Sequence, residues 1–137
     1  MLIFFIHVIF AYVCTSTILL FLHIHIHTHT NPDLKPDNIG FTSTGTLKLL
    51  DFGLCTFVRR GHADNGNYKL SGYTGSLRYM APEVALNQPY NEKVDVYGYG
   101  LILYEIITGV TPFSGFSKDK FFQRVVRNCE RPPLQYG

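Results

Sequence analysis

Three polar side chains of different chemistry stand close together in the segment NPDLKPDNIGF, residues 31–41. Asp33, Lys35 and Asn38 lie at offsets of 0, +2 and +5 around a proline, a spacing that would aim all three side chains into one small space. A carboxylate, a cation and an amide placed together suit the handling of phosphate groups, because that chemistry depends on positioning and charge neutralisation. The segment therefore raises the question of whether it is a working phosphate-transfer loop or the remnant of one.

A predicted β-hairpin follows this loop and would present a fourth polar side chain. Residues 39–50, IGFTSTGTLKLL, alternate as two short strands around a Ser-Thr-Gly turn, where Gly45 can supply a positive φ. Such a hairpin would hold Asn38 at one end and Asp51 at the other. A hairpin without a site would explain the alternation, but it would not explain polar residues at both ends.

Two helices are predicted farther along the chain. Residues 92–108 form the longer one, which ends at Gly109 and carries apolar residues at helical spacing: Val96, Tyr99, Leu103 and Ile106. Residues 117–128 form a shorter helix, which Ser117 would cap and which the following Arg-Pro-Pro-Leu segment would end. We therefore expect a mainly α fold with a small β-hairpin.

The distribution of charge divides the chain into two parts. All 12 Lys and Arg and all 10 Asp and Glu lie in residues 33–137, while residues 1–32 carry none. The net charge of +2 gives no bulk electrostatic reason to expect nucleic acid or a membrane surface as a partner. The three cysteines, Cys14, Cys55 and Cys129, stand far apart and indicate reduced thiols of an intracellular protein. We therefore expect a cytoplasmic location.

Residues 1–30 form an apolar, low-complexity segment that is separate from the charged part. The run at 2–22 is long enough, as a helix, to reach about 30 Å, the thickness of a bilayer core. The alternation HIHIHTHT at 23–30 is typical of what a CA dinucleotide repeat encodes. Three interpretations stay open for this segment: a gene-model artefact, a transmembrane span that would make the protein membrane-associated, and a degenerate core helix.

From Asn31 onward the chain resembles the C-terminal lobe of a eukaryotic protein kinase, through four motifs in order. NPDLKPDN resembles the catalytic loop, usually His-Arg-Asp-Leu-Lys-Pro-x-Asn, and DFGL at 51–54 resembles the metal-binding motif. TGSLRYMAPE at 74–83 resembles the substrate-side loop, and DVYGYGLILYEIITGVTPF at 95–113 resembles the central buried helix and its exit. The resemblance implies a partial, incomplete kinase domain over residues 31–137, consisting of the C-terminal lobe only.

The resemblance also implies roles for the polar residues of the loop. Asp33 would orient the attacking hydroxyl and take its proton, and Lys35 would contact the transferred phosphate and the substrate side. Asn38 and Asp51 would hold the Mg²⁺ of a bound ATP, since Mg²⁺ prefers oxygen ligands with few protein contacts. Lys35 and Ser76 point to Ser/Thr substrates, and the Arg-Tyr-Met and DVYGYG sequences point to the tyrosine-kinase-like group.

Further roles follow from the same resemblance. Residues 54–74 would be the activation segment, with candidate phosphorylation sites at Thr56, Tyr68, Ser71, Tyr73 and Thr74. Asp95 would anchor the backbone of the catalytic loop and is structural rather than catalytic. Glu83 would pair with an Arg in later helices, which we do not find in the sequence.

The chain departs from the family pattern at several places. Asn31 and Pro32 stand where the family usually has His and Arg, so the usual pairing of that Arg with an activation-segment phosphate would be absent. Gly98 stands where Ser is usual and would weaken its helix by up to about 1 kcal/mol. We find no glycine-rich loop and no strand lysine for the α- and β-phosphates, and we expect the isolated chain to have negligible kinase activity.

The sequence therefore predicts a fragment of a serine/threonine protein kinase. It would use ATP and Mg²⁺ to transfer the γ-phosphate to a Ser or Thr hydroxyl of a protein substrate, with no nucleic-acid partner. The alternative is a non-catalytic, pseudokinase-like interaction module, tethered to a membrane if residues 2–22 are a real span.

Overall fold

The computed structural model describes residues 29–57, 67–68, 70, 72 and 75–133. The apolar run at 2–22 and most of the His-rich alternation lie outside the described residues, and so do Ser71, Tyr73 and Thr74 of the predicted activation segment. Within the described ranges, no helix combines the length and the apolar composition that crossing a bilayer requires.

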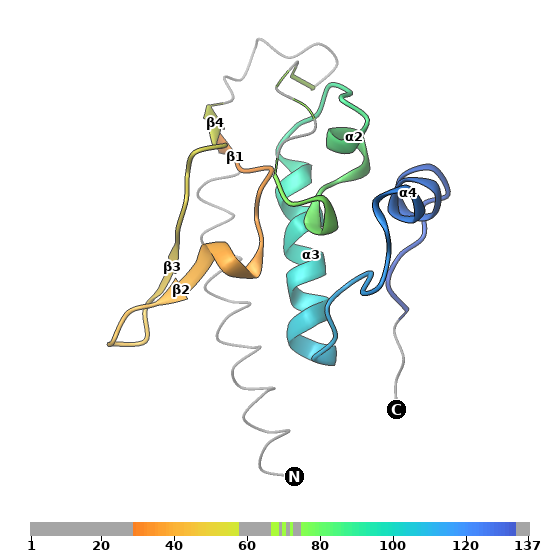
Figure 1. Cartoon of the computed structure of the whole chain (residues 1–137). Helices are drawn as coiled ribbons and strands as arrows, with labels where there is room; N and C mark the ends of the chain where they lie inside the picture. Colours follow the sequence, from red (N-terminus) through yellow and green to blue (C-terminus); the bar gives the residue numbers. More distant parts are fainter. Residues whose placement is uncertain (1–28, 58–66, 69, 71, 73–74, 134–137) are drawn as a thin grey trace.

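Among the described residues, one long helix stands between a group of short strands and a group of short helices (Figure 1). The strands are β1 (His29–Thr30), β2 (Ile39–Phe41), β3 (Leu47–Leu49) and β4 (Thr56–Phe57). The helices are the 3₁₀ turns η1 (Pro36–Asn38) and η2 (Leu77–Tyr79), the α-helices α2 (Pro82–Ala85), α3 (Lys93–Thr108) and α4 (Lys118–Phe121), and the π-helical η3 (Phe122–Arg127). The mainly α fold with a small hairpin, predicted from the sequence, agrees with this order.

Helix α3 begins and ends where its flanking residues predict. The Lys93 N–H donates to the Asn91 side chain at 3.0 Å, and Gly109 closes the other end with φ 67° and an N–H bond to Glu105. The predicted helix over 92–108 is therefore confirmed to within one residue. Of the apolar residues that predicted this helix, Tyr99 is buried, whereas Val96 is 49% exposed. Helix α3 is apolar on more than one side, so helical spacing alone did not identify the face that packs.

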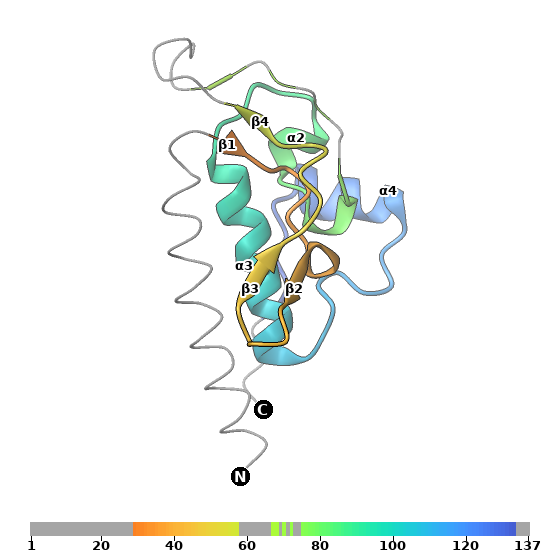
Figure 2. The same ribbon diagram turned by 90° about the vertical axis from the view of Figure 1, so that its left-hand side faces the viewer.

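The predicted hairpin is also confirmed. Strands β2 and β3 pair antiparallel, with Ile39 opposite Leu49 and Phe41 opposite Leu47 (Figure 2). Gly45 turns the chain with φ 79°, which a residue without a Cβ adopts readily. The Leu50 N–H donates to the Asn38 carbonyl at 2.8 Å and closes the base of the hairpin. A second pair, β1 with β4, joins the segment before the loop to the segment after the hairpin.

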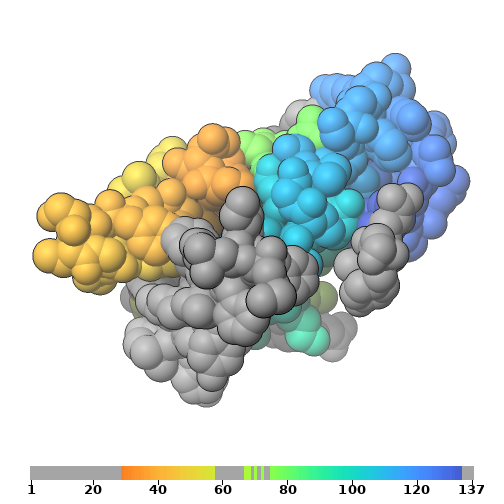
Figure 3. Space-filling view, turned by 90° about the horizontal axis from the view of Figure 1, so that it is seen from below, coloured from red at the N-terminus to blue at the C-terminus, as the bar shows by residue number. Residues whose placement is uncertain are grey.

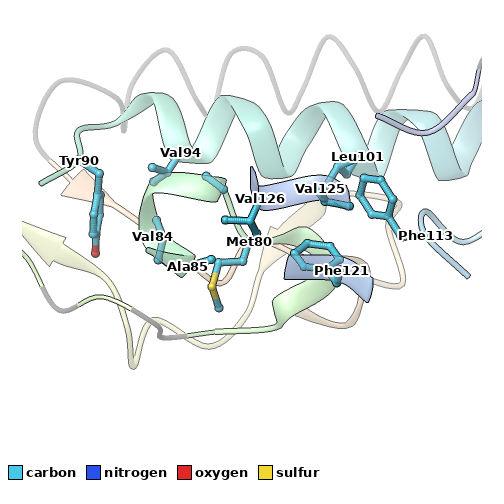
Figure 4. Close-up of a cluster of buried hydrophobic side chains, with 11 residues drawn as sticks. Met80, Val84, Ala85, Tyr90, Val94, Leu101, Phe113, Phe121, Val125 and Val126 are labelled. Carbon is cyan, nitrogen blue, oxygen red and sulfur yellow. The ribbon is translucent and has the colours of Figure 1, made fainter. Parts of the chain in front are cut away.

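Two groups of buried side chains hold α3 on opposite sides. The larger group joins α3 to α2, α4 and η3 and includes Met80, Val84, Leu101, Phe113, Phe121 and Val125 (Figure 4). The smaller group consists of Leu34, Tyr99 and Ile102, with the hairpin residues Ile39, Leu47 and Leu49 packed against it. The hairpin and the α4–η3 segment consequently project at opposite ends of the molecule (Figure 3).

The predicted helix over 117–128 begins as expected, but its second half is π-helical rather than α-helical. Ser117 caps it, since its hydroxyl accepts from the Lys120 N–H at 3.3 Å. After Phe121 the helix widens to a π-turn, in which the Asn128 N–H reaches the carbonyl of Gln123, five residues back. The wider turn keeps Phe121, Val125 and Val126 together on the core side, which an ordinary α-turn does less well.

Candidate active site

The loop from Asn31 to Asn38 buries one apolar side chain, Leu34, in the core, between the polar residues Asp33 and Lys35. Leu34 is 3% exposed and packs against Tyr99 and Ile102 of α3. Burying a leucine contributes about 1.5–3 kcal/mol, which is enough to fix the backbone on either side of it. Asp33 lies in the turn before Leu34 and Lys35 in extended backbone directly after it, and their side chains meet at 2.8 Å.

Asp33 lies at the centre of a converging group of donors. The Ser76 N–H donates to its Oδ1 at 2.6 Å, and the Lys35 ammonium donates to its Oδ2 at 2.8 Å. The Asn38 amide nitrogen donates to the Asp33 carbonyl at 3.0 Å and to Oδ2 at 3.3 Å. Four of the residues selected from the sequence therefore meet in one place, although Ser76 is 43 residues from Asp33 along the chain.

These donors set the protonation state of Asp33. Burial by itself would raise the pKa of the carboxyl, but the hydrogen bonds from Lys35 and Ser76 outweigh burial and hold the pKa below its ordinary value. Asp33 is thus an ionised acceptor at neutral pH, able to accept a hydrogen bond from a hydroxyl brought beside it.

Lys35 ties the loop to the segment that carries Ser76. Its ammonium donates to the Ser76 hydroxyl at 2.9 Å while it also contacts Asp33. The Lys35 ammonium therefore lies between the Asp33 carboxylate and the Ser76 hydroxyl. From this position it can neutralise a negatively charged group that binds near either of them.

Gly75 permits this approach, and sequence reasoning did not select it. Its φ is +97°, and a Cβ built there would lie 2.9 Å from the Asp33 carboxylate and 2.9 Å from the Pro32 carbonyl. No other residue type fits without moving the loop, because real Cβ atoms do not approach that closely. The signal in the sequence was the glycine directly before Ser76.

Asp51 follows Leu50 at the base of the hairpin, where the Leu50 N–H bonds to the Asn38 carbonyl, so the two ends of the hairpin carry Asn38 and Asp51 as the sequence predicts. Its side chain is exposed, and its Oδ1 accepts from the Gly53 N–H at 3.0 Å. Within the described residues, no side-chain hydrogen bond joins Asp51 to Asp33, Lys35 or Asn38. Only the backbone bond from Leu50 to Asn38 links the two positions, so Asp51 stands beside the cluster rather than in it.

Asp95, on the first turn of α3, accepts hydrogen bonds from the residues at the start of the loop. The Asn31 N–H donates to both carboxylate oxygens, at 2.9 and 3.1 Å, and the Thr30 hydroxyl donates to Oδ1 at 3.0 Å. Burial raises the pKa of Asp95 to about 6, although these hydrogen bonds partly oppose the rise.

Sequence reasoning missed Thr30 and the side chain of Asn31. Thr30 is 0% exposed, and the Asn31 side-chain oxygen accepts from the Asp33 N–H at 3.2 Å. Both residues lie at the edge of the low-complexity segment 1–30. The composition of that segment gave no indication that Thr30 and Asn31 belong to the site. Both nevertheless pack into the site, and Thr30 pairs across β1 and β4 with Thr56.

The remaining selected residues lie away from this cluster. Glu83 is half-buried in the first turn of α2, and no ion pair joins it to a cation among the described residues. Thr74 lies outside the described residues. Gly98 is buried where α3 crosses the loop, and a Cβ there would be 3.1 Å from the Leu34 carbonyl. The glycine therefore has a packing reason that helix propensity alone does not show.

Comparison with known proteins places these observations in one family. The protein kinase domain profile matches residues 9–134 of the chain. The chain is 44% identical over 93 residues to the serine/threonine-protein kinase PEPKR2 of Arabidopsis thaliana, covering 68% of this chain and 18% of that protein. It is 40% identical over 95 residues to sperm motility kinase 2B of Mus musculus, covering 69% and 18%.

A third relative is the serine/threonine-protein kinase VIK of Arabidopsis thaliana, 43% identical over 84 residues, with 60% of this chain and 19% of that protein covered. The chain thus spans at most 19% of the length of each of these three curated relatives. The profile match covers nearly the whole chain, and the chain belongs to the protein kinase family.

Proposed function

We propose that the chain carries the catalytic loop of a serine/threonine protein kinase, and that residues 31–137 are part of the C-terminal lobe of its kinase domain. One observation carries the proposal. The Lys35 ammonium lies 2.8 Å from the Asp33 carboxylate and 2.9 Å from the Ser76 hydroxyl, and the Ser76 N–H holds the other oxygen of Asp33. The names of the similar proteins support the Ser/Thr class.

Asp33 orients the hydroxyl of the protein substrate and accepts its proton as the phosphoryl group is transferred. Its lowered pKa makes it a weak base before reaction, so its main contribution is to hold the hydroxyl in line. The proton moves to the carboxylate late, when the oxygen–phosphorus bond is forming and the hydroxyl has become acidic.

Lys35 neutralises negative charge on the transferred group, since it already bridges the acceptor carboxylate and the substrate-side loop. Ser76 keeps that loop beside Asp33 through its N–H and hydroxyl. Together they support a Ser or Thr hydroxyl as the acceptor.

Asn38 and Asp51 are suited to hold the Mg²⁺ of a bound ATP. The Asn38 amide nitrogen is committed to Asp33, so the amide oxygen is the atom left for a second partner. Asp51 offers an exposed carboxylate at the adjoining end of the hairpin. A carboxylate and an amide oxygen fit a metal that takes few protein ligands besides the phosphates of its nucleotide, and bound Mg²⁺·ATP would supply the phosphoryl group.

The isolated 137-residue polypeptide is proposed to be inactive in phosphate transfer. Its sequence contains no glycine-rich loop and no strand lysine to hold the phosphates of ATP. Loss of one such preorganised donor lowers a rate by about 10²–10³, and loss of several lowers it further.

The test is phosphate transfer from radiolabelled ATP by the endogenous protein, immunoprecipitated with an antibody against residues 117–128. Cells edited to carry Asp33→Asn provide the comparison, because this change keeps the shape of the side chain and removes its charge. Transfer to a protein substrate that disappears with Asp33→Asn is the expected result.

Transfer that survives Asp33→Asn contradicts the proposed role of this residue. Binding of Mg²⁺·ATP without transfer, measured by calorimetry, favours a non-catalytic interaction module instead. We also propose a cytoplasmic location for the protein. Recovery of the endogenous protein in carbonate-resistant membranes would instead favour attachment through residues 2–22.

A further inference from the structure

Asn31 is one of the residues at which the chain departs from the pattern of its family, and its side chain is bonded to Asp33. The Asn31 Oδ1 accepts from the Asp33 N–H at 3.2 Å. Donor and acceptor are two residues apart, which is the arrangement of an Asx turn. Lys35, Ser76 and Asn38 hold the carboxylate and the carbonyl of Asp33, so Asn31 is the side chain that holds its backbone N–H.

Every backbone N–H of the turn from Asn31 to Asp33 is accounted for by this arrangement. The Asn31 N–H donates to both oxygens of Asp95, at 2.9 and 3.1 Å, and Pro32 has no N–H. The Asp33 N–H is the remaining donor, and Asp33 is only 8% exposed. A buried backbone N–H needs a partner, and the Asn31 side chain supplies it.

The sequence of the turn restricts its backbone as well. Proline fixes the φ of residue 32 near about −65°, and the residue before a proline is confined to extended conformations. Asn31 is anchored to α3 through Asp95 and is bonded through its side chain to the backbone of Asp33. Asn31 therefore fixes the proposed acceptor residue relative to the long helix.

The nitrogen of the Asn31 amide indicates that packing does not explain this side chain. Nδ2 is buried and has no hydrogen-bond partner among the described residues. A buried unpaired donor destabilises a fold, and an apolar side chain of similar size would avoid that cost. Natural proteins break such a rule mainly at functional sites. What the Asn31 amide contributes is the acceptor for the Asp33 N–H.

We propose that Asn31 is a positioning residue for phosphate transfer, and that its side-chain oxygen sets the backbone of Asp33 so that the carboxylate faces the substrate hydroxyl. Asn31 acts through Asp33 and touches neither the substrate nor the phosphate. The inference rests on the proposed kinase function and adds a residue to its site. The expected signature is a fall in kcat with little change in KM, because the orientation of the acceptor matters more in the transition state than in substrate binding.

Asn31→Thr and Asn31→Val test the oxygen with two side chains of nearly the same shape. Both are β-branched and fit the extended backbone before a proline. The Thr hydroxyl can accept from an N–H two residues ahead, and the Val methyl cannot. In the endogenous protein, immunoprecipitated from edited cells, Asn31→Val is expected to lower kcat by about ten- to a hundredfold, while Asn31→Thr stays within about threefold of the unaltered protein.

Asn91→Val is the control for the loss of the same kind of bond away from the site. The Asn91 Oδ1 accepts from the Lys93 N–H at 3.0 Å, also two residues ahead, at the start of α3. Its loss should lower the urea midpoint of the chain and leave kcat within about twofold. Asn31→Val and Asn31→Thr should differ in kcat while their urea midpoints stay close together.

Amide hydrogen exchange measures the bond to Asp33 without any activity. The sample is the ¹⁵N-labelled 137-residue chain, followed by NMR. The Asp33 N–H is expected to exchange at least about tenfold more slowly in the unaltered chain and in Asn31→Thr than in Asn31→Val.

Equal kcat values for Asn31→Val and Asn31→Thr overturn the proposal, and so does a fall in kcat for Asn91→Val as large as that for Asn31→Val. If the unaltered protein transfers no phosphate, the proposed function fails, and hydrogen exchange still decides the role of Asn31. Fast exchange of the Asp33 N–H in the unaltered chain overturns that role, whereas slow exchange that becomes fast in Asn31→Val supports it. Asp33→Asn should abolish transfer and keep the N–H of residue 33 protected, so the two proposals fail independently.

Discussion

Replacing Thr30 by Val tests whether the edge of the low-complexity segment is part of the site. The change removes the hydroxyl that donates to Asp95 Oδ1 at 3.0 Å and leaves a side chain of nearly the same shape. Thr30 is 0% exposed, so water cannot replace the lost donor without rearrangement. Asp95 keeps only the backbone N–H of Asn31 among the donors described here.

The size of the effect depends on pH in a direction that the structure determines. Burial raises the pKa of Asp95 from its ordinary 3.8 to about 6, so the folded state holds this proton more tightly than the unfolded state. The stability gained from that proton is full below the unfolded pKa and is lost as the pH rises through about 6, a change of about 3 kcal/mol. Removing a donor to the ionised form raises the folded pKa further.

Thr30→Val should therefore lower the free energy of unfolding by about 2 kcal/mol near pH 8, where Asp95 is ionised, and by about 1 kcal/mol near pH 5, where it is protonated. Urea denaturation followed by far-UV circular dichroism measures both values, which is convenient because the chain has no tryptophan. Thr56→Val is the control, since Thr56 is the half-buried partner of Thr30 across β1 and β4. A loss that is equal at both pH values, or equal for the two variants, would refute this reasoning.

Three further substitutions test the local geometry by the same denaturation measurement. Gly75→Ala should lower the free energy of unfolding by about 2 kcal/mol or more, because it combines a left-handed φ with a Cβ 2.9 Å from Asp33. Gly98→Ala should bring no net gain, since its better helix propensity is offset by the 3.1 Å approach to Leu34. Ser117→Ala should cost about 1 kcal/mol, because the Lys120 N–H loses its cap.

Each of these three substitutions has a control substitution that lacks the contact or the cap being tested. Gly45→Ala has a left-handed φ of +79° but nothing within 4 Å, so it should lose only the backbone part, about 1 kcal/mol. Gly100→Ala lies in the same helix with open space around it and should stabilise the chain by about 1 kcal/mol. Ser114→Ala removes an exposed hydroxyl that caps no helix and should change little. Indistinguishable values within any of the three pairs would contradict the contact named for it.

The sequence was informative where the cause of a structure lies within a few residues. The hairpin followed from alternation and from Gly45, helix α3 from its spacing and from Gly109, and the cap of α4 from Ser117. In each case the hydrogen bond or the backbone angle that decides the element belongs to residues that are neighbours in the chain.

The sequence was less informative where the burial of a residue depends on packing against segments that are distant in the chain. It counted Val96 in the apolar stripe of α3, yet that residue is 49% exposed, because the helix is apolar on several sides and its partners select the faces. It also treated Gly98 as a weakness of the helix, while the crossing of the loop over α3 puts the Leu34 carbonyl 3.1 Å from the place that a Cβ would take.

The resemblance of four motifs in order, the one with Asp33, Lys35 and Asn38 among them, was thus enough to predict a phosphate-handling loop and the family to which the chain belongs. Only the tertiary structure decided which groups complete it. Ser76 reaches Asp33 across 43 residues, and Thr30 reaches Asp95 across 65, through contacts that no local pattern encodes. The physical reason is that periodicity and propensity act over a few residues, whereas these contacts form only when the burial of Leu34 against α3 brings distant segments together.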